Sequence, residues 1–575
     1  MPQHMQPSLV GLLPKLRLQF DQSAAELDGR AQHAGIEKER WCVTKKDLQC
    51  FRNAVRKSIN LGLIQPTQKD PFNLATDAVG PNVYTVNDQF IKPISALFGD
   101  TSFALLWHPH GLKCDLFITH AWIEGAFEFV DRVLTSWPTG TNHAYCCMLS
   151  NPQNLDISDL ISSPSDSPFA AALQAAHTMV ALPNQTSSIY GRLWCVYEAH
   201  LACESGMLIK TATRSSHPRV WPMAIAIAAL SLGGAALGRL YHSYGIADSY
   251  ADELAFAAVG NVPLALSLSV AGDRSSLICN CVGAVAGGFY WNCTDSSDLI
   301  VCFSFVYIAY YVLSEFDRAR RAEVRTSLEQ LTKGFSGSVR DAQCSSLADH
   351  DAIWSAIGDK VTAVDHSIDV LRSAGMSTPS LRDASLAGVP VKNAGLMEFA
   401  FLALKYPTSI YFSWGLLCFD SLLMVCLAVM MLLVELVWTA LLMLLQRDRR
   451  ALHLMIAYKL FMLALPCIVL ARLGVASPLV PLRSPKMALW CGLLLCPLQA
   501  LGCCLSLLGV SGIVRIAGPR FARLLVARGF VVPDVRCCHQ ASSCPSSSKS
   551  AGASGSASPE EETGGLDWRN ALPGA

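Results

Sequence analysis

Charged residues are scarce in this sequence, and neither sign of charge dominates. Only 16% of the 575 residues are Asp, Glu, Lys or Arg, whereas soluble globular domains contain about 25%. Hydrophobic residues make up 51%, and the formal net charge is zero. This charge balance does not favour nucleic-acid binding. The composition instead predicts a membrane protein with attached soluble parts.

Several short catalytic motifs are also absent. The sequence contains no P-loop, no glycine-rich dinucleotide fingerprint after a strand, no GxSxG and no HExxH. The spacing of His108, His110 and Cys114 matches no common ligand set. We therefore predict no metal site and no cofactor.

The N-terminal segment lacks the features of a signal peptide. Its apolar stretch is short and is interrupted by Pro14 and Lys15. We therefore expect the first 215 residues to lie in the cytosol. Their cysteines show no disulfide pattern, which favours reduced, structural thiols at Cys42, Cys50, Cys114, Cys146, Cys147, Cys195 and Cys203.

Long apolar runs fill much of the second half of the chain. A membrane-spanning helix needs roughly 20 such residues, so about five to seven crossings are expected. The protein is thus predicted to be an integral, multi-pass protein of a lipid bilayer whose identity is left open. The runs cover residues 220–238, 254–272, 276–291, 299–313, 411–445, 454–473 and 487–514.

Residues 114–212 alternate between strand and helix patterns. This alternation predicts a parallel sheet with helices on both faces. The expected strands are CDLFITH (114–120), AYCCMLS (144–150), HTMVALP (177–183) and MLIKTA (207–212). The expected helices cover 123–136, 168–176 and 190–204.

Two further helices are predicted from apolar spacing. In 44–61, apolar residues recur every three or four positions and Thr44 can cap the start. Its basic residues favour a solvated face over contact with a membrane or an anionic ligand. In 349–374, apolar residues follow a 4, 3, 4, 3 spacing and Gly375 ends the pattern. That helix is too short for a typical coiled coil, so packing against its own domain is favoured over dimerisation.

These patterns divide the chain into successive parts. The expected division is an N-terminal region (1–113), an α/β domain (114–215), a block of about four transmembrane helices (220–313), a soluble helical segment (314–409), a second block of two or three transmembrane helices (410–515), and a basic, then disordered Ser/Gly-rich tail (516–575).

Glu198 stands out within IYGRLWCVYEAHLA (189–202). On a helix, Leu193 and Tyr197 belong to the core-facing stripe, and Trp194 and Glu198 form the neighbouring row. A carboxylate at that border is partly desolvated, which raises its pKa and makes it a candidate for chemistry. The alternative is a structural role, for example a bond to Arg192.

The FITH strand, the VALP strand, the loop NQTSSIYGR and the W-C-x-x-E helix together resemble the Toll/interleukin receptor (TIR) domain. The resemblance covers about 114–212 and implies a flavodoxin-like α/β fold. In enzymatic TIR domains the glutamate of this motif is catalytic in NAD cleavage, and Glu198 occupies its position here. The segment THAWIEG (119–125) departs from the Phe-Arg-Gly-like segment of plant TIR domains.

A second resemblance covers the HAW-x-EG segment, the Cys-Cys strand and the multi-pass C-terminal half. These features look like those of membrane proteins from single-celled algal protists, which implies no activity.

The TIR resemblance also implies a chemistry and a binding site. NAD would be the substrate, and a carboxylate near the ribose would stabilise an oxocarbenium-like transition state without a metal. Trp194, His120 and Trp122 are the candidate substrate-binding residues, although packing and loop capping are favoured for His120, Trp122 and Glu124.

Three functions are compatible with the sequence. The favoured one is a membrane-anchored TIR-like signalling protein, with TIR–TIR or homo-oligomer contacts and no nucleic acid. The second is an NAD-cleaving enzyme, an NAD+ nucleosidase, that uses Glu198. The third is a transporter or channel with a regulatory cytosolic domain, indicated by ionisable residues in apolar runs at Asp420, Glu435 and Lys459.

Overall fold

The fold is taken from a computed structural model. It describes residues 20, 28–138, 140–157, 163–214, 217–244, 273–292, 311–312, 315, 318–319, 322–344, 346–392, 394 and 510–524. Several sequence predictions fall outside these residues, namely the spans at 254–272, 411–445 and 454–473, the ionisable residues Asp420, Glu435 and Lys459, and the tail beyond 524.

A six-stranded mixed sheet forms the centre of the structure, in the order β1-β3-β2-β4-β5-β6. Its inner four strands are parallel, as predicted, and both edge strands run antiparallel to their neighbours. The prediction of a purely parallel sheet was therefore wrong at the edges. The strands are β1 (Val43–Thr44), β2 (Leu116–Thr119), β3 (His143–Tyr145), β4 (Thr178–Ala181), β5 (Leu208–Thr211) and β6 (Met376–Ser377).

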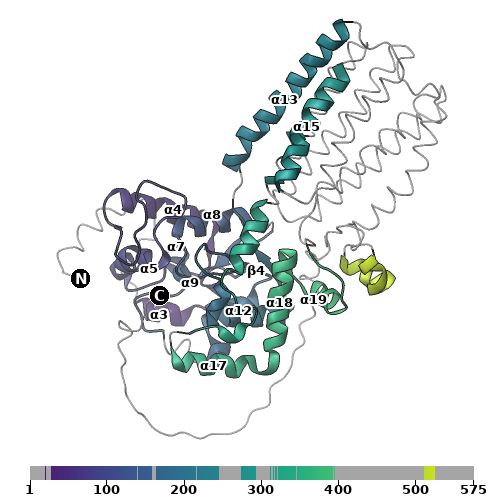
Figure 1. Cartoon of the computed structure of the whole chain (residues 1–575). Coiled ribbons are helices and arrows are strands. Elements are labelled where there is room, and N and C mark those ends of the chain that lie inside the picture. The colour runs from purple at the N-terminus through teal and green to yellow at the C-terminus, as the bar shows by residue number, and fades with distance from the viewer. Residues whose placement is uncertain are drawn as a thin grey trace, which may run out of the picture.

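Helices cover both faces of the sheet, which gives three layers (Figure 1). Alternate residues of β2 point to opposite faces: Leu116 and Ile118 enter one core, and Phe117 enters the other. The first core lies under α4 (Lys45–Asn60), α5 (Val83–Val86), η4 (Asn87–Ile91), α6 (Lys92–Ser95), α7 (Phe103–Trp107), α8 (Ala126–Ser136) and α9 (Cys147–Ser150). The second lies under α11 (Pro168–Ala175), α12 (Leu193–Glu204), α17 (Leu347–Ile357) and α18 (Val361–Ala374).

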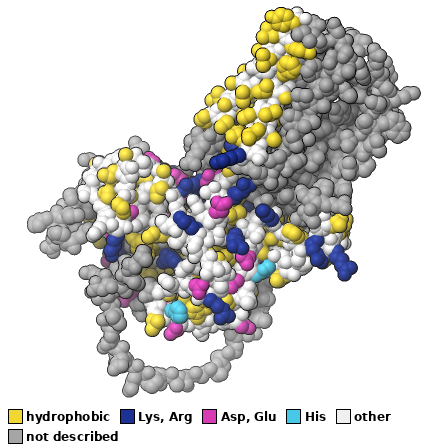
Figure 2. All heavy atoms as spheres, in the orientation of Figure 1, with side chains coloured by type: hydrophobic (Ala, Val, Ile, Leu, Met, Phe, Trp, Pro, Cys, Tyr) yellow, Lys and Arg dark blue, Asp and Glu magenta, His cyan; other side chains and the backbone are white. Residues whose placement is uncertain are grey.

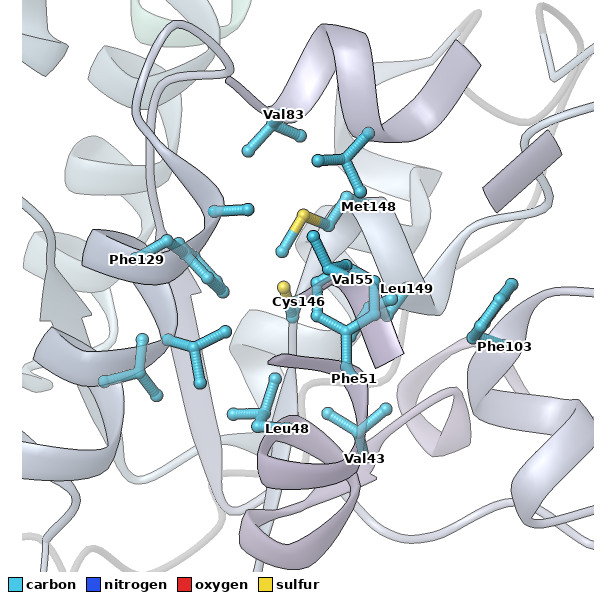
Figure 3. Packing of buried hydrophobic residues seen from close by; sticks show 14 of the residues in the cluster. Val43, Leu48, Phe51, Val55, Val83, Phe103, Phe129, Cys146, Met148 and Leu149 are labelled. Atoms are coloured by element: carbon cyan, nitrogen blue, oxygen red, sulfur yellow. The ribbon is translucent and has the colours of Figure 1, made fainter. Parts of the chain in front are cut away.

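Helix α4 confirms the amphipathic pattern predicted for 44–61. The apolar residues with this spacing are buried, namely Leu48, Phe51, Val55 and Ile59, and Figure 3 shows the first three among the packed side chains of the first core. Thr44 and Asp47 form a capping box at its start. On the other face, Arg52 contacts Asp131 of α8 at 2.8 Å. That basic side chain is thus paired within the domain.

Two local predictions were wrong. The strand expected over 144–150 ends at Tyr145, because β1 and β2 pair with β3 only through residues 143–145, and α9 begins at Cys147. The helix expected over 349–374 is interrupted at Gly358, whose φ of 58° and ψ of −129° suit only glycine.

The sheet draws on sequence far from 114–215. Strand β1 comes from the N-terminal region, and β6 comes from the segment expected as a separate soluble piece. The apolar residues spaced along 357–371 are buried against α12, which confirms the predicted packing within the domain. The remaining helical elements are α3 (Gly29–Gly35), η3 (Lys38–Arg40), η5 (Ala96–Phe98), η6 (Pro164–Asp166), η7 (Ile189–Gly191), η8 (Val339–Asp341), η9 (Gly358–Lys360) and α19 (Pro379–Leu386).

Two apolar helices, α13 (His217–Ser243) and α15 (Asp273–Asn292), pack side by side and extend away from the sheet (Figure 1). Among the described residues, one helix is long and apolar enough to cross a bilayer, over Trp221–Ser243, and α15 holds a shorter apolar stretch, Leu277–Phe289. Their surface is mainly hydrophobic in Figure 2, whereas charged side chains gather over the α/β part. One such helix is weak support, so multi-pass topology stays a prediction.

Glycines let α13 and α15 approach closely. A Cβ on Gly234 would lie 2.2 Å from the carbonyl oxygen of Val285, and one on Gly288 would lie 2.1 Å from that of Ser231. Small residues serve this purpose at helix interfaces in membranes.

We expect Gly234→Val to separate this helix pair, because its side chain has no space at the contact. The expected loss is about 1–3 kcal/mol of stability, as for other overpacked sites. The neighbouring Gly233→Val is the matched control, since a Cβ there meets nothing within 4 Å. Thermal unfolding of the two variants in the same detergent measures the difference, and equal transitions would contradict the close contact.

Candidate functional site

The candidate site lies at the carboxyl ends of β2 and β4. These strands are neighbours, but the chain passes through β3 on the far side of β2 before it reaches β4. Open α/β sheets bind ligands in the crevice at such a point of reversal. Thr119 and His120 end β2 there, Asn184 follows β4, and α12 begins beside them.

Glu198 lies deep in this site. Its side chain projects from α12, the residue is 6% exposed, and its Oε2 atom accepts no hydrogen bond from any residue that the structure describes. Burial raises the pKa of Glu198 to about 7, against the opposing influence of Thr119, His120 and Arg192. The structural alternative, a bond to Arg192, is not formed in the described residues.

Two other polar groups near Glu198 have no partner among the described residues. Tyr190 is 1% exposed, and its hydroxyl makes no hydrogen bond within that part of the chain. The side chain of Arg192 is partly exposed and forms no ion pair with any described carboxylate. Burial lowers the pKa of Arg192, but the influence of neighbouring residues, Cys195 first among them, raises it overall. The guanidinium therefore stays charged and can pair with an anion.

Backbone contacts hold Arg192 at the start of α12. Leu193 donates its N–H to the carbonyl of Gln343 at 2.9 Å, and Gln343 donates to the carbonyl of Gly191 at 2.8 Å. The segment after 322 thus fixes the turn that positions both Arg192 and the helix carrying Glu198.

His120 lies between an acid and a thiol. Its Nδ1 atom is 2.7 Å from Oε1 of Glu124, an ion-pair distance without the alignment of a hydrogen bond. Its Nε2 atom is 3.2 Å from Sγ of Cys147. Burial lowers the pKa of His120, but its contacts with Cys147, Cys146 and Glu124 raise it well above its ordinary value.

The two candidate tryptophans occupy different places. Trp122 lies with His120: its indole N–H contacts Sγ of Cys147 at 3.3 Å, and its ring packs on Tyr84. Trp194 is held by α17 instead, because its indole N–H donates to Asp349 at 3.2 Å. The structure thus brings His120, Trp122 and Glu198 to one edge, while Trp194 joins α12 to the covering helices.

Cys147 also lies at this site, although sequence analysis did not select it as a candidate. It was assigned to a continuous strand and to the structural thiols. The sequence did contain a signal for this contact. FITH and AYCC were both expected as parallel strands, and residues at the carboxyl ends of such strands meet at one edge of the sheet, which would place Cys147 near His120.

Comparisons with known proteins identify no relative. No family model, no curated protein and no solved structure matches the chain. Within the described ranges, no group of three His, Cys, Asp or Glu side chains is arranged to hold a metal ion. What the site does must therefore be argued from its own geometry.

The raised pKa of Glu198 predicts a pH-dependent stability. The folded state holds the proton up to about pH 7, whereas the ordinary value is 4.5. The proton on Glu198 thus contributes to the free energy of unfolding. This contribution is complete below about pH 4.5 and is lost as the pH rises through 7. At its largest it amounts to about 3 kcal/mol.

Glu198→Gln keeps a neutral side chain at every pH and lacks this dependence. Between about pH 5 and pH 8, wild type should lose stability relative to Glu198→Gln in thermal unfolding. A constant difference between the two proteins would contradict the buried, protonated carboxyl.

Proposed function

We propose that this chain is a membrane-anchored, TIR-like protein that cleaves the N-glycosidic bond of NAD. The observation that carries the proposal is the buried carboxyl group of Glu198 near the guanidinium of Arg192. Among the described residues, one oxygen of Glu198 accepts no hydrogen bond and Arg192 forms no ion pair. The strand order supports the TIR-like assignment. The parallel strands lie in the order β3-β2-β4-β5. Counted along the chain among themselves, they have the order 2-1-3-4, which matches the first four strands of the flavodoxin-like order 2-1-3-4-5.

The chemistry assigns separate roles to the two groups. Nicotinamide leaves as a neutral molecule, and positive charge develops on the ribose. The carboxylate of Glu198 stabilises that charge and accepts a proton from the attacking water. The products are nicotinamide, ADP-ribose and a proton. Arg192 pairs with the pyrophosphate, whose charge and geometry suit a guanidinium.

Access to Glu198 requires movement at the rim of the site. The carboxyl group is covered in this structure, and the rim carries the aromatic pair Tyr84 and Trp122, whose rings lie 5.4 Å apart. Catalytic groups often reach their working geometry only when substrate binds. Binding of the cationic nicotinamide riboside would also favour the ionised form of Glu198.

The proposed anchor follows the sheet directly. Strand β5 ends at Thr211 and α13 begins at His217, so five residues separate the sheet from the apolar helix. This short link would hold the domain at the cytosolic surface of the membrane. An integral, multi-pass arrangement remains part of the proposal, on the strength of the apolar runs.

A second candidate function is a signalling module without turnover. The packing of α17 and α18 on α12 favours this candidate, because these helices bury the helix that carries Glu198. Trp194 of α12 is also fixed by its hydrogen bond to Asp349 of α17. In that case the domain would act through TIR–TIR or homo-oligomer contacts. Absence of nicotinamide release from wild type, including protein clustered on liposomes, would favour this candidate.

Arg192→Gln tests the proposed pyrophosphate contact. Loss of a charge-assisted hydrogen bond costs about 1.5–3 kcal/mol, so NAD should bind roughly 10- to 100-fold more weakly. Arg340→Gln is the control, because it removes the same charge from an exposed position on nearby η8. Isothermal titration of the full chain with NAD compares them. Equal affinities in both variants would place the pyrophosphate elsewhere.

A further inference from the structure

Cys147 and His120 follow neighbouring parallel strands. Phe117 of β2 pairs with Tyr145 of β3, and both strands end within a few residues of this pair. The carboxyl ends of paired parallel strands lie side by side, which brings the two side chains together. The resulting distance between Sγ of Cys147 and Nε2 of His120 is 3.2 Å.

Glu124 completes a series of three groups. Its Oε1 atom lies 2.7 Å from Nδ1 of His120, and both side chains are 1% exposed. A thiol in contact with an imidazole that a carboxylate orients is the arrangement of an activated cysteine nucleophile. Because Nδ1 faces the carboxylate, Nε2 is the nitrogen that exchanges a proton with the sulfur.

Cys147 is partly exposed, whereas His120, Glu124 and the adjacent Cys146 are buried. The indole N–H of Trp122 contacts Sγ and favours negative charge on it. Tyr84, which packs on Trp122, and the neighbouring Ile123 are each 49% exposed. The thiol therefore lies beside an apolar, aromatic rim.

We propose that Cys147 is the nucleophile of an acyl-transfer site that takes esters or thioesters of apolar acyl groups. The thiolate attacks the carbonyl carbon, and the bond to the leaving alkoxide or thiolate breaks as His120 gives it a proton from Nε2. Water then attacks the S-acyl group with His120 as the base, which releases the carboxylic acid and restores the thiol. The net reaction is hydrolysis, so no oxidant or reductant is needed. Glu198 takes no part, so this proposal stands or falls separately from NAD cleavage.

The test uses the full chain in detergent and p-nitrophenyl octanoate as the probe. We expect a burst of about one p-nitrophenolate per chain and an octanoyl adduct on Cys147, located by peptide mass spectrometry. Cys147→Ala should lower the burst rate by about 100-fold or more. Cys203→Ala is the matched control, because Cys203 is also partly exposed and lies on α12. A full burst from Cys147→Ala, or an adduct located only on other cysteines, would overturn the proposal.

Wild-type protein supplies a test that needs no variant. Iodoacetamide at about pH 6 should label Cys147 at least 10-fold faster than Cys203, because the sulfur of Cys147 contacts an imidazole that can accept the thiol proton. Glu124→Gln tests the positioning role of that acid: the burst rate should fall about 10-fold while the burst amplitude stays near one per chain. Equal labelling of the two cysteines, or no burst from folded wild type, would also overturn the proposal.

Discussion

Glu198→Gln is expected to lower nicotinamide release from NAD by at least about 100-fold, the usual effect of removing one preorganised electrostatic group from an active site. Glutamine has nearly the same shape as glutamate but carries no charge to stabilise the developing oxocarbenium ion. Because the folded state already favours the neutral form, the substitution leaves packing around α12 intact. The measurement is initial release from liposome-bound protein at saturating NAD.

Glu204→Gln is the control for this experiment. Glu204 ends the same helix, is exposed, and pairs with Lys360 at 2.7 Å. Exposed pairs contribute little, so this variant should release nicotinamide at the wild-type rate. If Glu198→Gln also retains wild-type release, the carboxyl group of Glu198 has no catalytic role.

Glu128→Ala is expected to destabilise the protein by about 3–5 kcal/mol, the cost of breaking a buried ion pair. Glu128 of α8 contacts both Arg132, at 2.8 Å, and Arg214, and Gln185 donates to its other oxygen at 2.7 Å. The side chains of Glu128 and Arg132 are 3% and 1% exposed. Removal of the acid leaves these arginines without their shared counter-charge.

Thermal unfolding of the full chain measures this loss, which should lower the transition by about 10 °C. Asp131→Ala is the control on the same helix, because Asp131 is 46% exposed where it meets Arg52. Its loss should cost less than about 1 kcal/mol. Similar transitions for the two variants would show that the buried network contributes no more than an exposed pair.

The Glu128 network also joins the sheet to distant segments. Arg214 precedes α13, and Arg132 donates to Gln330 at 2.5 Å within the helical segment 322–331. If α13 anchors the domain, its position relative to α8 depends on this cluster.

Local patterns allowed the central elements to be predicted from sequence. The apolar spacing of 44–61 gave α4, and the alternation over 114–212 gave the four parallel strands and their helices. These signals are strong because each element buries one regular face. Edge strands β1 and β6 contain two residues each, which is too short for any periodicity.

The depth of the candidate site could not be predicted in the same way. Glu198 was expected at the border of the core, but α17 and α18, about 150 residues later, cover the remaining side of α12. The contact between Cys147 and His120 depends on where β3 ends. Only the pairing with β1 and β2 fixes that point at Tyr145.

The most direct test of the account is release of nicotinamide from NAD by the wild-type chain in liposomes, at low and at high protein density. We predict stoichiometric formation of nicotinamide and ADP-ribose, with a rate that rises as the pH increases through about 7, because Glu198 must ionise to act. The contradicting result is no nicotinamide at either density from protein that remains folded.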